Sequence, residues 1–171
     1  DGSKAEITQS TNYPWTGAVS ISIKLDEPKE FGLAFRIPGW CRTPKKLING
    51  EETDIANVLA DGYAIIFRTW KDGDQIELDF PMEAVRMSSH PLVRADIGKV
   101  AIQHGPTVFC LEEVDNGPNL QTIVLPRDSK PEVSFREDLL GGVNVITAQG
   151  EKASKEAWGQ ELYKADTCTE Y

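Results

Sequence analysis

Apolar and polar residues alternate along much of the first half of the chain. In residues 18–25 every second residue is apolar, with serine or lysine between them, and residues 31–37 repeat the pattern. Successive side chains of a β-strand point to opposite faces, so this period of two predicts strands that each bury one face. The polar stretch 26–30 predicts a chain reversal, and we expect the two strands to pair as a hairpin.

Two further reversals are predicted before residue 81. Asn49-Gly50 is the strongest signal, because both central positions of a type I′ turn need a positive φ. The alternating runs 63–67 and 76–80 flank another turn and predict a further hairpin. The first of these runs places three large apolar side chains on one face of its strand: Tyr63, Ile65 and Phe67.

The second half of the chain continues the strand-rich pattern. Its strand candidates are residues 99–103, 107–113, 121–125 and 143–148. A turn-rich stretch at residues 88–91 separates the halves, and no convincing amphipathic helix lies between the strands. The pattern therefore predicts an all-β chain of two small antiparallel β-sandwich, jelly-roll-like domains, residues 1–89 and 90–171.

Charge and hydropathy exclude two classes of partner. The 171 residues carry 18 Lys and Arg against 27 Asp and Glu, a net charge of −9, which repels nucleic acid and anionic lipid. No stretch approaches 18 consecutive apolar residues, so membrane insertion is not expected. Because the chain lacks an initiator Met and a strand pattern begins almost at once, we expect a segment cut from a longer protein.

Reactive side chains are few and scattered. No cysteine spacing resembles a zinc-ligand pair, the chain has two histidines, and the cysteines are Cys41, Cys110 and Cys168. Glu112 and Glu113 are neighbours on a strand, so they point to opposite faces and cannot share a hydrolytic site without a bulge. We therefore predict no catalytic, cofactor-binding or metal-ligating residue in this chain.

The tryptophans offer one binding hypothesis. An exposed ring can stack on the C–H face of a sugar, whereas a buried ring contributes to a core or a domain interface. Core or interface packing is the expectation for most of them. Trp15 precedes Gly17 in a polar segment and is the candidate sugar contact.

Several segments form an ordered set that is more specific than a strand pattern. They are Thr11-Asn12-Tyr13-Pro14-Trp15, Phe35-Arg36-Ile37-Pro38-Gly39-Trp40, Ile48-Asn49-Gly50-Glu51, residues 68–74, Phe80-Pro81-Met82, residues 100–106 and residues 109–116. Together they resemble the C-terminal region of the β-L-arabinofuranosidase-like glycoside hydrolases, family 127, formerly a domain of unknown function. The resemblance covers most of residues 7–116.

The resemblance implies where the chemistry resides. Members of this family carry catalysis on an (α/α)6 barrel, with a cysteine nucleophile beside a zinc ion and a glutamate as acid/base, and two β-sandwiches follow. The chain resembles the sandwiches without the barrel, so its implied partners are its own upstream catalytic domain and plant-type glycans. Zinc is implied only for that missing domain, and a secreted or periplasmic parent protein is expected. The thin similarity after Asn116 implies either an incomplete second sandwich or a divergent member.

Two functional hypotheses remain, and a third, a self-contained enzyme that uses carboxylates of the second half, is disfavoured because the sequence offers no paired site. In the first, the chain is the non-catalytic part of a glycoside hydrolase that braces the barrel and shapes its cleft, and it is inactive alone. Pro38-Gly39 ends a strand and leaves Arg36 and Trp40 at the sheet's end, suited to a domain interface. In the second, the chain is a free-standing carbohydrate-binding module that uses exposed aromatic side chains.

Overall fold

The computed structural model describes residues 4–152 and 159–163, and within them the chain is built of strands and short helical turns. The strands of the first half are β1 (Ala5–Thr11), β2 (Ala18–Leu25), β3 (Lys29–Arg36), β4 (Lys45–Ile48), β5 (Glu51–Glu52), β6 (Leu59–Ala60), β7 (Tyr63–Trp70) and β8 (Gln75–Asp79). Those of the second half are β9 (Ala84–Ser88), β10 (Val100–His104), β11 (Thr107–Phe109), β12 (Ile123–Val124), β13 (Glu132–Arg136), β14 (Val143–Thr147) and β15 (Glu151–Lys152). The described helical elements are α1 (Glu113–Asn116) and the 3₁₀ turns Ala56–Val58, Arg94–Asp96 and Leu120–Thr122. The predicted all-β class is confirmed.

By its contacts the chain divides into two compact units. The first contains residues 1–85 together with 103–108, and the second contains residues 86–102 and 109–171. The described part of the chain contains no helix long and apolar enough to span a membrane.

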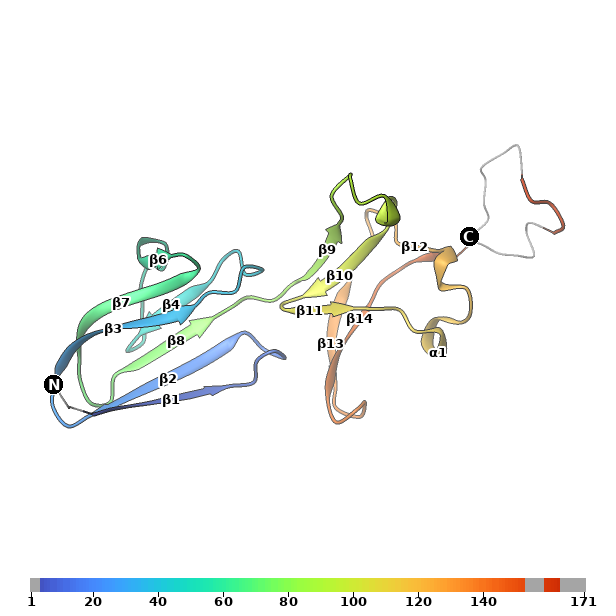
Figure 1. Cartoon of the computed structure of the whole chain (residues 1–171). Coiled ribbons are helices and arrows are strands. Elements are labelled where there is room, and N and C mark those ends of the chain that lie inside the picture. Colours follow the sequence, from blue (N-terminus) through green and yellow to red (C-terminus); the bar gives the residue numbers. More distant parts are fainter. Residues whose placement is uncertain (1–3, 153–158, 164–171) are drawn as a thin grey trace. The chain divides into compact units, whose positions relative to one another are not determined.

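The first unit is a sandwich of two antiparallel sheets. One sheet has the strand order β1-β2-β8-β4-β5 and the other has the order β3-β7-β6. Figure 1 shows β8 running between β2 and β4, and β7 beside β3. In register, Ile21 of β2 lies opposite Ile76 of β8, so that alternate apolar residues of neighbouring strands share the inner face.

Two of the expected hairpins are wrong. The β2 strand pairs with β1 and β8, whereas β3 pairs with β7 in the other sheet. Likewise β7 and β8 belong to different sheets. The polar connections between these strands carry the chain from one sheet to the other. In this arrangement both strands of each pair bury an apolar face in the space between the sheets. The turn predicted at Asn49-Gly50 is confirmed: their φ angles are 53° and 80°, and they join β4 to β5.

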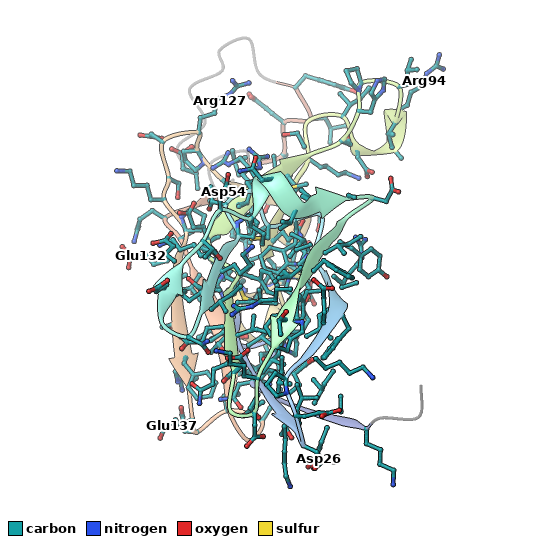
Figure 2. The ribbon with its side chains drawn as sticks, turned by 90° about the vertical axis from the view of Figure 1, so that its left-hand side faces the viewer. Asp26, Asp54, Arg94, Arg127, Glu132 and Glu137 are labelled. Atoms are coloured by element: carbon teal, nitrogen blue, oxygen red, sulfur yellow. The ribbon has the colours of Figure 1, made fainter. Side chains whose placement is uncertain are left out.

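The core of the first unit lies between its two sheets, where the side chains of its strands gather (Figure 2). Its buried apolar members are Val19, Ile21, Ile23, Leu25, Ile37, Cys41, Ile48, Ala64, Ile66, Trp70, Ile76, Leu78 and Phe80. Trp70 at the end of β7 is fully buried, and its Nε1 donates a 3.0 Å hydrogen bond to the carbonyl oxygen of Phe31. This bond satisfies the polar edge of the ring, so the indole can occupy the core without leaving a donor unpaired.

One charged side chain enters this sandwich. Lys46 on β4 is 3% exposed, and its Nζ donates a 3.1 Å hydrogen bond to the carbonyl oxygen of Asp54, labelled in Figure 2. Burial lowers the pKa of Lys46, and the nearby Asp54 charge opposes that effect. The ammonium thus ties β4 to the loop that follows β5.

A buried carboxylate fixes the connection between β7 and β8. Asp74 is 7% exposed and accepts 2.9 Å hydrogen bonds from the Lys71 backbone amide and from the Asn49 side chain. Asn49 in turn accepts a 2.8 Å bond from the Gln75 amide. This network joins the connection between the sheets to the Asn49-Gly50 turn.

The second unit buries much less apolar surface. Two of its sheets are small, with β12 paired to β15 and β13 paired to β14. The three-stranded sheet of order β11-β10-β9 contains residues of both units, because residues 84–85 and 103–108 are grouped with the first. Among the described residues of this unit, no side chain is buried. Several large apolar side chains are mostly exposed, among them Leu92 (83%), Ile97 (67%) and Leu140 (88%).

Candidate functional site

Arg36 ends β3 on the outer face of the β3-β7-β6 sheet. Its Nη1 donates hydrogen bonds to the carbonyl oxygens of Gly62, at 2.8 Å, and Ile37, at 3.3 Å, and its Cζ lies 5.5 Å from the centre of the Tyr63 ring. A Cβ atom at Gly62 would collide with this Nη1, so glycine is needed for the guanidinium to approach. These contacts hold the guanidinium of Arg36 over the Tyr63 ring, and the residue stays exposed at the end of the sheet.

Trp40 contacts a different set of neighbours. Its ring stacks on Tyr13, with 6.5 Å between centroids, and meets Phe80 edge-on at 6.4 Å. Its indole Nε1 is buried and has no hydrogen-bond partner among the residues that the structure describes. A buried donor without an acceptor is rare in folded proteins.

Three of the segments that carry the family resemblance meet within the first unit. Tyr13, Trp40 and Phe80 come from these segments and form one aromatic cluster. The Phe80 amide donates to the carbonyl oxygen of Gly17, where a Cβ atom would collide with the Phe80 carbonyl. The sequence identified the segments but did not predict the aromatic contacts between them, because contacts between distant segments depend on strand pairing.

Trp15 lies in the loop between β1 and β2, where its amide donates a 2.9 Å hydrogen bond to Asn12. It is 43% exposed, and Tyr13 is 39% exposed. Residues of the same loop line a shallow hollow of about 480 Å³ on the outer face of the five-stranded sheet. The outward side chains of β2 are small in this region, β8 contributes Glu77 and Asp79, and β4 contributes Leu47, so the lining of the hollow is mixed.

The outer face of β7 is apolar. Tyr63, Ile65 and Phe67, which the alternation places together, are 43%, 47% and 69% exposed, and the opposite face of the strand carries Ala64 and Ile66 into the core. The strand is therefore apolar on both faces over five consecutive residues. Arg36 lies opposite Tyr63 in the sheet, so it borders this face.

The described residues contain no cluster of three or more His, Cys, Asp or Glu side chains that could hold a metal ion. Burial raises the pKa of the Cys41 thiol, a bond from the Thr43 amide opposes this effect, and the Asp79 charge adds to it. A thiol in this environment is a poor nucleophile. Cys110 is exposed, and Cys168 lies outside the described residues. Glu113 is the first residue of α1, and its side chain accepts a hydrogen bond from the Asn119 amide, which is a structural role.

Two family models match consecutive parts of the chain. The model described as "Beta-L-arabinofuranosidase, GH127 middle domain" matches residues 1–82, and the "Glycoside hydrolase family 127 C-terminal domain" matches residues 84–153. Among curated proteins, a non-reducing end β-L-arabinofuranosidase of Bifidobacterium longum subsp. longum is 34% identical over 149 residues. That match covers 82% of this chain and 22% of the relative.

Solved structures show the same relation. The crystal structure of Ara127N-Se, a GH127 β-L-arabinofuranosidase from Geobacillus stearothermophilus T6, aligns with a TM-score of 0.94 at 51% identity, over 97% of this chain and 26% of that one. A second GH127 β-arabinofuranosidase aligns with a TM-score of 0.81 at 31% identity, over 90% of this chain and 27% of that one. The chain thus spans about a quarter of the length of these relatives, and it belongs to the C-terminal β-sandwich region of glycoside hydrolase family 127.

Proposed function

We propose that this chain is the non-catalytic β-sandwich part of a β-L-arabinofuranosidase-like glycoside hydrolase and that it braces the catalytic domain and its cleft. The observation that carries the proposal is the exposed apolar surface of the second unit, in which none of the described side chains is buried. A domain of this size is stable only if it buries apolar area, so the missing cover is expected from the rest of the parent protein. We also propose that the two sandwich domains, residues 1–89 and 90–171, meet between residues 89 and 90.

Hydrogen exchange tests the bracing role. We expect the amides of β13 and β14 to exchange at least about tenfold more slowly in the full-length parent enzyme than in the 171-residue chain, because covering their apolar side chains suppresses local opening. The amides of β2, whose alternate side chains are already buried, provide the internal control. Equal exchange of β13 and β14 in the two proteins would refute the brace.

Arg36 and Trp40 are our proposed interface residues on the first unit. Arg36 is exposed at the end of β3, where a neighbouring domain can reach it. Arg36→Ala should lower the melting temperature of the parent enzyme by several degrees more than that of the isolated chain, where it removes its bonds to backbone carbonyls and its contact with the Tyr63 ring. Lys24→Ala is the matched control, because Lys24 is an exposed cation whose partner is Glu6. Equal shifts for Arg36→Ala in the two proteins would exclude the interface role.

A carbohydrate-binding module is the second candidate function. The exposed ring of Trp15 and the carboxylates of Glu77 and Asp79 in the hollow lined in part by its loop favour it, since sugars bind through ring stacking and through hydrogen bonds to hydroxyl and carboxylate groups. Titration of the chain with a soluble arabino-oligosaccharide separates the candidates. A saturable change in tryptophan fluorescence that Trp15→Ala abolishes would favour the binding module, whereas a brace gives no such change.

A further inference from the structure

The β3-β7-β6 sheet presents a flat apolar surface that the sandwich itself does not use. Tyr63, Ile65 and Phe67 stand in a row along β7 on the face opposite the core. Their neighbours on β3 are small: Ala34 lies opposite Ile65, and Gly32 lies opposite Phe67. We name these five residues the β7 face.

A strand that is apolar on both faces is typical of a sheet covered on both sides. The other sheet of the same sandwich differs, because the outward residues of β2 are alanine, serine and lysine and those of β8 include Glu77. One outer surface of the sandwich is thus polar and suited to water, while the other exposes aromatic and aliphatic side chains together. Contiguous exposed apolar side chains that include Tyr and Phe are characteristic of interaction sites.

We propose that the β7 face is the surface on which the catalytic part of the parent chain docks. This inference rests on the proposed bracing function and specifies the surface of the first unit that carries it. Relatives are about four times as long as this chain, which covers 26% of the Geobacillus enzyme, so a large covalently linked partner is available. A second copy is disfavoured because each copy carries a net charge of −9.

The small residues of β3 explain how such a partner reaches the sheet. With Gly32 and Ala34 beside Phe67 and Ile65, the partner can contact the full side of each large β7 side chain. Arg36 borders the row at Tyr63, where its guanidinium is held by backbone carbonyls. The surface therefore has an apolar centre with a charged residue at each end of its β3 edge, Glu30 and Arg36, and an apolar centre with a polar rim is common in protein interfaces.

Cysteine labelling tests the proposal with little change to the fold. Ile65→Cys is introduced into the 171-residue chain and into the full-length parent, each is exposed to a maleimide, and labelling of the peptide that contains residue 65 is followed by mass spectrometry. We expect labelling in the parent to be slower by more than about tenfold than in the isolated chain. Ser22→Cys on the polar outer face of β2 is the matched control, and it should label at similar rates in both proteins.

Three outcomes would overturn the proposal. Rapid labelling of Ile65→Cys in the parent would show that the β7 face is uncovered there. Protection that depends on protein concentration in the isolated chain would assign the face to a second copy. Concentration-independent protection in the isolated chain would assign it to the other unit of the same chain. Slow amide exchange of β13 and β14 in the parent together with rapid labelling at residue 65 would support the bracing function but would show that the β7 face is not the docking surface.

Discussion

Trp70→Ala is expected to lower the free energy of unfolding of the chain by about 3 to 5 kcal/mol, the cost of replacing a large buried aromatic residue with alanine. Trp70 is fully buried, packs 6.2 Å from the Phe31 ring and supports the guanidinium of Arg68 at 5.1 Å. Its loss also leaves the Phe31 carbonyl oxygen without the indole donor. Urea denaturation followed by circular dichroism measures the change.

Phe67→Ala is the matched control for this variant. Phe67 is an aromatic residue three positions earlier on the same strand, but it is 69% exposed on the opposite face. Its replacement should change the stability of the 171-residue chain by less than about 0.5 kcal/mol. If Phe67→Ala cost as much as Trp70→Ala, the assignment of the two faces of β7 would be wrong.

Asp74→Ala is expected to cost about 2 to 3 kcal/mol, because it removes a buried charged acceptor and leaves two donors without a partner. These donors are the Lys71 amide and the Asn49 side chain. The change loosens both the connection between the sheets and the Asn49-Gly50 turn. Asp26→Asn, in the exposed turn after β2 (Figure 2), is the control and should be close to neutral.

The same carboxylate gives the chain a defined acid sensitivity. Burial raises the pKa of Asp74, but the hydrogen bonds from Lys71 and Asn49 and the nearby charges of Arg68 and Lys71 outweigh it, so the pKa lies below its ordinary value. The unfolded chain therefore binds the proton more readily than the folded chain. The stabilisation is present above the unfolded-state pKa of about 3.9 and is lost as the pH falls through the folded-state pKa.

Denaturation curves at successive pH values check this sign. Between pH values of about 5 and 2, the wild-type chain should lose more stability than Asp74→Asn, which has no carboxylate to protonate at this position. Parallel losses in the two proteins would mean that Asp74 does not contribute to the acid transition.

Strand periodicity predicted the fold class and the buried face of strands such as β2, but it did not predict the partners of the strands. The alternating apolar residues of β2 and β3 would look the same in a hairpin and in a connection between two sheets, because either arrangement buries one face of each strand. Local backbone chemistry was more informative at Asn49-Gly50, where the turn depends on its own φ angles and not on distant contacts.

The candidate site shows a similar division. The sequence indicated that Arg36 and Trp40 stand near the end of a strand, but their neighbours, Tyr63 for the first and Tyr13 with Phe80 for the second, come from other parts of the chain. On β7, two apolar sets alternate, and the pattern alone cannot tell which set faces the core. The fully buried Trp70 and its hydrogen bond to Phe31 define the inner face.

The central position of β8 has a consequence for synthesis. This strand is the last of the first unit's sandwich to be translated, yet it lies between β2 and β4 and pairs with both. Until residue 79 has left the ribosome, β2 and β4 have no neighbour on their facing edges, and the nascent chain holds an open sheet that could pair with other strands. The sandwich can therefore close only after β8 emerges, so its final assembly is a late and non-local step.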